Sequence, residues 1–230
     1  MKHNNFFNNF YIALYSIKKY GVGVFIKSVF YEIYYSFKYF DNAFFDFDQT
    51  ENPEASHEAS WTSSNYSTPN IPTPYYFLSQ ISKVLKKEKI DNFNLIDLGC
   101  GSGRLVKYFD NKFSINFVGF DISKRIINKN LNKFKKKNLF FFCQDLKEIR
   151  QPDQLNIFFE RLEKKIFLVF ISDSFDSQSI LNLIKIFKLK LGEFFFVMVN
   201  QKNLEEFDKF NPFKKIIFAD KNRNISFYKI

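Results

Sequence analysis

The chain has 230 residues, of which 46% are apolar, so it is long enough for one domain with a substantial hydrophobic core and an N-terminal extension. Only two histidines and two cysteines are present, which argues against a His-based zinc site, a Ser-His-Asp triad and a disulfide framework. The formal net charge of +10 would suit nucleic acid or an anionic membrane surface, but a biased base composition also produces such an abundance of Phe, Lys, Asn and Ile. We therefore expect a cytoplasmic protein without a metal site, for which nucleic acid stays open as a partner but is not favoured.

Residues 1–48 are basic and aromatic, and their apolar side chains recur at the spacing of helices. Gly21 and Gly23 interrupt this pattern and predict two helices. We favour helices that pack on the remainder of the chain. The alternative is peripheral contact with a membrane surface, because lysines flank an aromatic face between residues 10 and 40. The same lysines break the apolar run, so no transmembrane segment is predicted.

Residues 49–74 are polar and hold four of the six prolines and the single tryptophan, Trp61. Loops of this length in compact domains often have a function, so we expect a lid over a binding site. The segment ends in Pro72-Thr-Pro-Tyr75, where two prolines favour a fixed, extended path. Apolar residues on one face of Tyr75–Lys87 then predict a helix, which opens the third part of the chain, residues 75–230.

From residue 93 onward, short apolar segments alternate with segments of helical periodicity. The first five predicted strands are each followed by a helix, as right-handed parallel crossovers require, and residues 220–224 are short enough to join the last two strands as a hairpin. This pattern predicts an α/β fold. The predicted strands are 93–98, 115–121, 139–143, 166–171, 194–200, 215–219 and 225–230, and the predicted helices are about 103–110, 123–135, 153–164, 177–191 and 203–210.

Three of the seven glycines lie in the motif Asp97-Leu-Gly-Cys-Gly-Ser-Gly-Arg104, between the first predicted strand and its helix. Glycine suits a tight turn with unusual dihedral angles and lets a ligand approach the backbone closely. A dinucleotide-binding G-x-G-x-x-G motif would place a glycine at position 104, where this chain has arginine. The acid at Asp97 is poorly suited to a pyrophosphate but suits a ligand with an ammonium group. The alternative is a strand-turn-helix with incidental glycines.

Two further acids end the next two predicted strands: Asp121 lies 24 residues after Asp97, and Asp145 lies 24 residues after Asp121. Because the carboxyl ends of parallel strands meet at one edge of a sheet, we expect the three acids to line one crevice. A carboxylate at Asp121 can accept hydrogen bonds from both hydroxyls of a ribose. The alternative for Asp121 is an N-cap of the next helix, which Ser123 could equally provide.

In these motifs the chain resembles the class I S-adenosylmethionine (SAM) methyltransferases. The resemblance implies a Rossmann-like, seven-stranded sandwich of five parallel strands and a C-terminal antiparallel hairpin, here with an N-terminal helical extension. It implies SAM as the cofactor, with the ribose at Asp121 and Ile122 and the adenine at Gln144 and Asp145. The methionine moiety would lie at the glycine loop, at Asp97, Gly99, Cys100, Gly101 and Gly103.

The chain is also similar to a bacterial group within that superfamily, closely in Pro72-Thr-Pro-Tyr75 and loosely in Phe45–Thr50. The first element is similar, more weakly, to protein-lysine methyltransferases of the mitochondrial ATP-synthase-subunit type. Two segments depart from the group: Ser172-Asp-Ser-Phe175 stands where Asn-Pro-Phe is usual, and Val199-Asn-Gln201 stands where Val-Asn-Pro is usual. The first departure makes methylation of DNA adenine or a glutamine amide less expected.

The candidates for the reacting side are Asp173, Tyr75 and Phe175. Asp173 could orient or deprotonate a hydroxyl or an amine, or it could cap the following helix. Tyr75 could stack near the sulfonium, or it could simply begin a packing helix. We expect methyl transfer to a small molecule, a glycan precursor or a protein lysine. The alternatives are an RNA methyltransferase and a SAM-binding protein without turnover.

Overall fold

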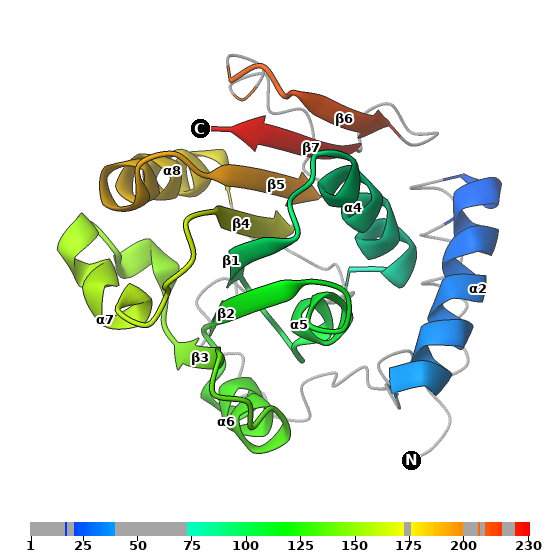
Figure 1. Cartoon of the computed structure of the whole chain (residues 1–230), viewed down its shortest axis with the longest axis horizontal. Helices are drawn as coiled ribbons and strands as arrows, with labels where there is room; N and C mark the ends of the chain where they lie inside the picture. Colours follow the sequence, from blue (N-terminus) through cyan, green and yellow to red (C-terminus); the bar gives the residue numbers. More distant parts are fainter. Residues whose placement is uncertain are drawn as a thin grey trace.

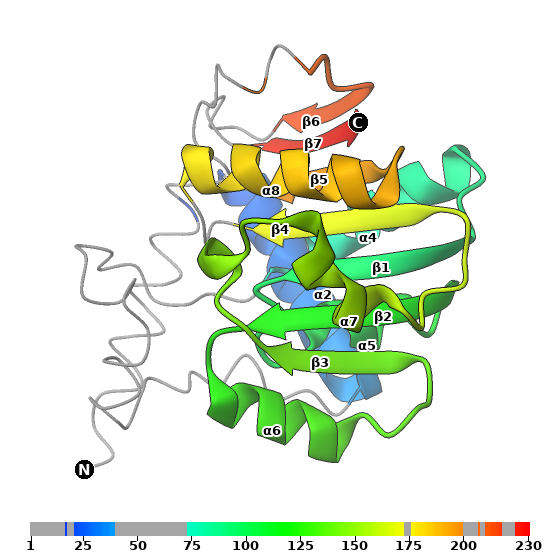
Figure 2. The same ribbon diagram turned by 90° about the vertical axis from the view of Figure 1, so that its left-hand side faces the viewer.

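The computed structural model describes residues 17, 21–39, 73–172, 176–199, 207, 210–217 and 224–230. This part of the chain is built on a seven-stranded sheet with the strand order β3-β2-β1-β4-β5-β7-β6 (Figure 2). The first five strands are parallel, and β7 is antiparallel to both β5 and β6, so the predicted Rossmann-like arrangement is confirmed. The strands are β1 (Asn92–Leu98), β2 (Ser114–Asp121), β3 (Leu139–Cys143), β4 (Phe167–Ser172), β5 (Phe195–Val199), β6 (Lys214–Ile217) and β7 (Asn224–Lys229).

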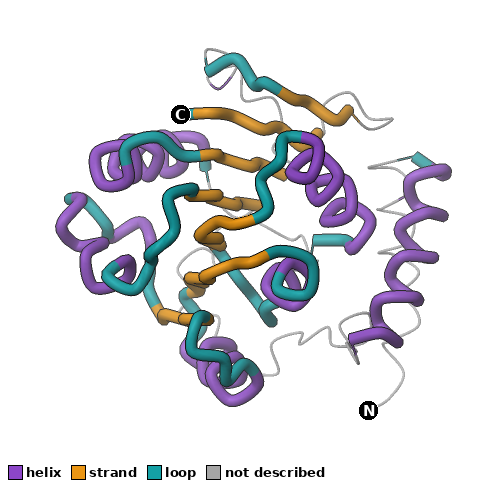
Figure 3. The backbone as a smooth tube through the Cα atoms, in the orientation of Figure 1, coloured by secondary structure: helices purple, strands orange, loops and turns teal. Residues whose placement is uncertain are grey.

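Helices cover both faces of the sheet (Figures 1 and 3). Successive residues of a strand point to opposite faces, so Phe93 and Leu95 of β1 join the core on the side of α4 and α5. Ile96 and Leu98 join the core on the side of α7 and α8. The helices are α4 (Tyr75–Lys87), α5 (Arg104–Phe109), α6 (Lys124–Lys133), α7 (Asn156–Phe159) and α8 (Ser177–Leu191), with short 3-10 turns η2 (Leu146–Glu148) and η3 (Pro152–Leu155).

The helix α2 (Val22–Tyr39) lies outside α4 at the periphery of the molecule (Figure 1). The ring of Tyr31 meets that of Tyr76 edge-on at 5.4 Å, and the ring of Tyr35 lies 5.1 Å from that of Tyr75, centroid to centroid. Such aromatic pairs add to the stabilisation that burial alone provides. Through these rings, α2 is held against the layer of helices that covers the sheet.

The sequence pattern placed the break between two helices at Gly21 and Gly23, and α2 begins between them, at Val22. Gly21 has a φ of 82° and precedes α2, as expected of a residue that interrupts a helix. Gly23 instead lies in the first turn of α2, and a Cβ there would meet no atom within 4 Å. Nothing about its surroundings requires a glycine, so the helix continues through it at the modest cost of one flexible residue.

The predicted helix over 153–164 is also shorter in the structure, where helical turns end at Phe159. The reason lies in β1, because the buried carboxamide of Asn94 donates to the carbonyl of Lys164 at 2.7 Å and accepts from its amide at 3.4 Å. These two bonds hold the approach to β4 in an extended path. The predicted helix at 203–210 and the predicted lid over 49–74 fall largely outside the described residues.

Candidate active site

The glycine loop joins the carboxyl end of β1 to the start of α5 in a tight left-handed path. The amides of Gly99 and Cys100 both donate to the carbonyl of Phe120 in β2, at 2.9 and 2.7 Å. Gly103 caps α5 with a φ of 74°, and a Cβ there would lie 2.5 Å from the ring of Phe134. Both the backbone conformation and the packing therefore require glycine at this position.

Asp97 lies on the same strand as the core residues Phe93 and Leu95 and is only 3% exposed. In the described part of the chain, its carboxylate accepts no hydrogen bond. Burial, and then the nearby charge of Asp121, raise the pKa of Asp97 well above its ordinary value. A buried acid without a partner is costly to the fold, so such residues are concentrated at sites where a ligand supplies the missing partner.

Asp121, at the carboxyl end of β2, connects the glycine loop to the next turn. Its Oδ2 accepts from the amide of Gly101 at 3.0 Å, and its Oδ1 accepts from the amide of Ser123 at 2.9 Å. Burial raises the pKa of Asp121, while hydrogen bonds from the amides of Ser123, Gly101 and Ile122 act in the opposite direction. The N-cap of α6 is Ser123, whose Oγ accepts from the amide of Ile126 at 3.4 Å. The helix-cap alternative for Asp121 is therefore not needed to explain α6.

The carboxyl end of β3 lies against the carboxyl end of β2. The amide of Gln144 donates to the carbonyl of Asp121 at 3.0 Å, and the thiol of Cys143 donates to the carbonyl of Ile122 at 3.4 Å. Asp145 caps the turn η2 by accepting from the amide of Lys147 at 2.9 Å, and it is half-buried. The fold thus brings Ile122, Gln144 and Asp145 beside Asp121, at the edge of the sheet where parallel strands present ligand-binding residues.

Asn130 of α6 is a site residue that the sequence reasoning missed. Its Nδ2 donates to the carbonyl of Gly101 at 2.7 Å and lies 3.9 Å from Sγ of Cys100. Asn130 is 1% exposed and follows Ile127 by three residues, so an amide on the apolar face of a helix was the available signal. Burial, followed by Asp97 and Asp121, raises the pKa of the Cys100 thiol, which disfavours a thiolate there.

A buried ion pair fixes the residue that follows the loop. Nη1 of Arg104 lies 2.8 Å from Oε2 of Glu32 in α2, and both side chains are 6% exposed. Oε1 of Glu32 also accepts from the amide of Tyr75 at 2.7 Å, so one carboxylate joins α2, α4 and α5. The sequence reasoning recognised Arg104 only as a missing glycine and overlooked Glu32.

The candidates for the reacting side are placed only in part. Tyr75 is fully buried, and its ring lies 4.6 Å from the guanidinium carbon of Arg104. It therefore lies beside the residue that follows the glycine loop, with a cation already on its ring. A role toward a substrate stays a prediction for Tyr75. Asp173 and Phe175 lie outside the described residues.

A depression of about 740 Å³ lies at the opposite edge of the sheet. Nζ of Lys164 donates there to Oγ and to the carbonyl oxygen of Ser114, at 2.8 and 3.0 Å. These polar groups of the depression are therefore already hydrogen-bonded to one another. Open α/β sheets bind ligands at the carboxyl ends of their strands, and Ser114 is the first residue of β2. We therefore expect the site at the edge that carries Asp97 and Asp121.

Comparisons with known proteins show which family the central part of the chain resembles. Residues 95–161 match a family model described as a methyltransferase domain, and this stretch includes the glycine loop, β2 and β3. No curated protein matches the chain. The resemblance to class I methyltransferases that the motifs predict is confirmed by this match and by the strand order.

Several solved structures are similar to the chain and distant from it in sequence. They include an RNA methyltransferase from Salinibacter ruber in complex with S-adenosyl-L-homocysteine, with a TM-score of 0.48 and 16% identity over 70% of this chain and 94% of that chain. A SAM-dependent methyltransferase from Clostridium acetobutylicum has a TM-score of 0.48 and 14% identity, over 66% of this chain and 90% of that one. Magnesium protoporphyrin IX methyltransferase from Synechocystis PCC 6803 with bound SAM has a TM-score of 0.47 and 13% identity, over 67% and 77%.

Proposed function

We propose that this chain is a SAM-dependent methyltransferase, with the cofactor held at the glycine loop and the acids that follow β1, β2 and β3. The observation that carries the proposal is the carboxylate of Asp97, which is buried, accepts no hydrogen bond within the described residues and lies near a second acid. Two carboxylates in one poorly solvated place favour a cationic ligand. SAM carries an ammonium group and a sulfonium, so its charge matches this site.

Each site residue has a distinct part in this proposal. Asp97 would accept from the ammonium group, and the free lone pairs of Asp121 would accept from the ribose hydroxyls while its bonds to Gly101 and Ser123 keep the loop in place. Gln144 and Asp145 would meet the adenine. Bound SAM supplies an activated methyl group, and the chain contributes alignment and the exclusion of water.

The position of Arg104 supports SAM over a dinucleotide. A Rossmann site for NAD places a glycine where this chain has Arg104, and a pyrophosphate would be approached by free amides and positive charge. Here the guanidinium turns to Glu32 in α2 and is committed to that carboxylate. The charge left at the loop is negative, from Asp97 and Asp121, which opposes a pyrophosphate.

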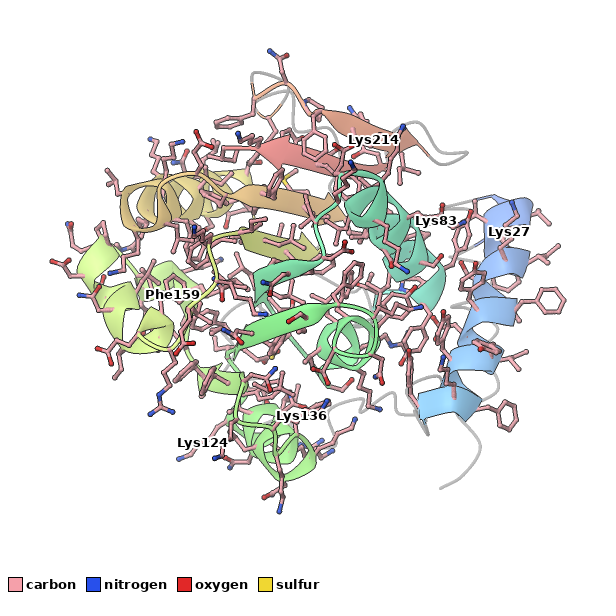
Figure 4. The ribbon with its side chains drawn as sticks, viewed as in Figure 1. Lys27, Lys83, Lys124, Lys136, Phe159 and Lys214 are labelled. Atoms are coloured by element: carbon pink, nitrogen blue, oxygen red, sulfur yellow. The ribbon has the colours of Figure 1, made fainter. Side chains whose placement is uncertain are left out.

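We expect the acceptor to be a small molecule, a glycan precursor or a protein lysine, with Asp173, Tyr75 and Phe175 on the reacting side. RNA is the alternative that the net charge suggests, and it would favour lysines gathered around the carboxyl ends of the strands. The lysines labelled in Figure 4 lie on separate elements of the molecule. They are Lys27 on α2, Lys83 on α4, Lys124 on α6, Lys136 before β3 and Lys214 on β6.

Calorimetric titration of the purified full chain with SAM, S-adenosyl-L-homocysteine and NAD tests the cofactor. We expect binding of the first two compounds and no binding of NAD. Binding of NAD without binding of SAM would overturn the proposal.

A labelling experiment then addresses the acceptor. The chain is incubated with methyl-labelled SAM and separate pools of protein, RNA, glycan precursors and small metabolites. Label in one pool identifies the acceptor class, with the RNA pool as the outcome that supports the alternative. SAM binding without label in any pool supports a binding protein without turnover.

A further inference from the structure

The outward face of α2 is apolar, and nothing in the described part of the chain covers it. Among the residues that the structure describes, six of the ten large apolar residues with exposed side chains lie on this one helix, and Phe30 and Phe37 are 68% and 80% exposed. Monomeric soluble domains rarely expose a contiguous apolar patch of this kind without a function. The outward face consists of Val22, Ile26, Phe30, Ile33, Tyr34 and Phe37.

These six positions form one continuous stripe. At 100° per residue, they occupy an arc of about 120° that runs for roughly 23 Å along the helix axis. The opposite side of α2 is already used, because Glu32 and Tyr35 are buried against α4 and α5. The helix is therefore fixed in rotation, and turning it cannot hide the stripe.

Among the described residues of α2, the two charges beside the stripe are positive. Lys27 and Lys38 are exposed along one edge of it, whereas the single acid of α2, Glu32, is buried on Arg104. An antiparallel pairing of two such helices would bring lysines together without an acid on the same face to offset them. An anionic lipid surface offers both an apolar layer for the stripe and negative charge for the lysines.

We propose that α2 is an interfacial helix that lays this outward face into the surface of an anionic membrane. In the described part of the chain, no helix is long and apolar enough to cross a membrane, so the attachment is to the surface. Figure 1 shows α2 at the periphery, with the sheet and its other helices all to one side, so a flat surface can reach it. This proposal does not depend on the identity of the cofactor or of the methyl acceptor.

Flotation with vesicles tests the proposal on the full chain. We expect binding to vesicles of phosphatidylcholine mixed with phosphatidylglycerol, and at least tenfold weaker binding to phosphatidylcholine alone. The double variant Phe30→Ser/Phe37→Ser should lose at least tenfold in binding to the mixed vesicles. The matched control is Ile157→Ser/Leu189→Ser, which removes two equally exposed apolar side chains from α7 and α8 and should bind as the wild type does.

The other outcomes overturn the proposal. Vesicle binding that survives Phe30→Ser/Phe37→Ser would show that net charge alone attracts the chain. Absence of vesicle binding, with a dimer in light scattering that the same variant dissociates, would assign the stripe to a second copy. Calorimetry with SAM on this variant should match the wild type, which separates a failure here from a failure of the proposed function.

Discussion

Two pairs of charged side chains are buried near the glycine loop. One pair has opposite charges, and the other has like charges. Glu32 and Arg104 neutralise each other at 2.8 Å, with a further hydrogen bond from the amide of Tyr75. Asp97 and Asp121 carry like charges, and burial raises the pKa of both. A compensated pair of this kind belongs to the architecture, whereas an uncompensated pair is tolerated where a ligand completes it.

The two pairs lie next to each other along the loop, which gives each a separate effect on it. Arg104 is the first residue of α5, directly after Gly103, so the ion pair fixes the far end of the loop. Asp121 holds its centre through the amide of Gly101. Removing a member of the first pair should therefore lower the free energy of unfolding. Removing a member of the second pair should weaken ligand binding.

The largest effect is expected from Arg104→Met, which leaves the carboxylate of Glu32 buried without its partner. Breaking a buried ion pair from one side costs about 3–5 kcal/mol of unfolding free energy. Urea denaturation of the wild type and the variant measures this loss. The double variant Glu32→Gln/Arg104→Met should regain part of it, because no charge is then left unpaired. A loss no larger than that of an exposed pair, about 1 kcal/mol or less, would contradict the structural role.

Asp97→Asn should instead stabilise the fold and weaken ligand binding. Without ligand, the variant should be more stable than the wild type at neutral pH, because it removes a buried charge without a partner. Its affinity for SAM should fall roughly 10- to 150-fold, as the loss of a charged hydrogen bond worth about 1.5–3 kcal/mol implies. Calorimetry and urea denaturation measure the two effects. The matched control is Asp91→Asn, at an exposed residue directly before β1. It should change neither the stability nor the affinity for SAM.

The pH dependence of this difference follows from the raised pKa of Asp97. The folded state holds the Asp97 proton more tightly than the unfolded chain does, so the contribution of Asp97 to stability is complete below its unfolded pKa of about 3.9. It is lost as the pH rises through the folded pKa. The stability advantage of Asp97→Asn should accordingly be absent below a pH of about 3.9 and should grow as the pH rises above it. An advantage that does not change with pH would exclude the ionisation of Asp97 as its cause.

Asp121→Ala should have the smallest effect of the three on the fold. It removes the acceptors for the amides of Gly101 and Ser123 as well as those proposed for the ribose, and we expect roughly tenfold weaker SAM binding or more. Circular dichroism should be unchanged, because Ser123 still caps α6. Normal SAM binding by this variant in calorimetry would restrict Asp121 to holding the loop.

Local sequence signals predicted the parts of the site that local geometry decides. Asp97, the glycines and Asp121 could be recognised because a strand followed by a glycine turn and a helix fixes where the strand ends. Asn130 and Glu32 could not, since each reaches the loop from another element across a long stretch of sequence. The predicted helix over 153–164 ends early for the same reason, because Asn94 of β1 holds Lys164 in an extended path.

The sequence by itself determined the α/β class, the alternation of strands and helices that ends in a hairpin, and the acids at the strand ends, because apolar periodicity and turn chemistry act over a few residues. Only the tertiary structure decided what surrounds those acids. Burial and the distances between elements determine that Arg104 is neutralised by Glu32, while Asp97 is left without a partner among the described residues. The same packing turns one face of α2 inward and leaves its apolar stripe outside, because helical periodicity gives two faces but does not say which one the fold will cover.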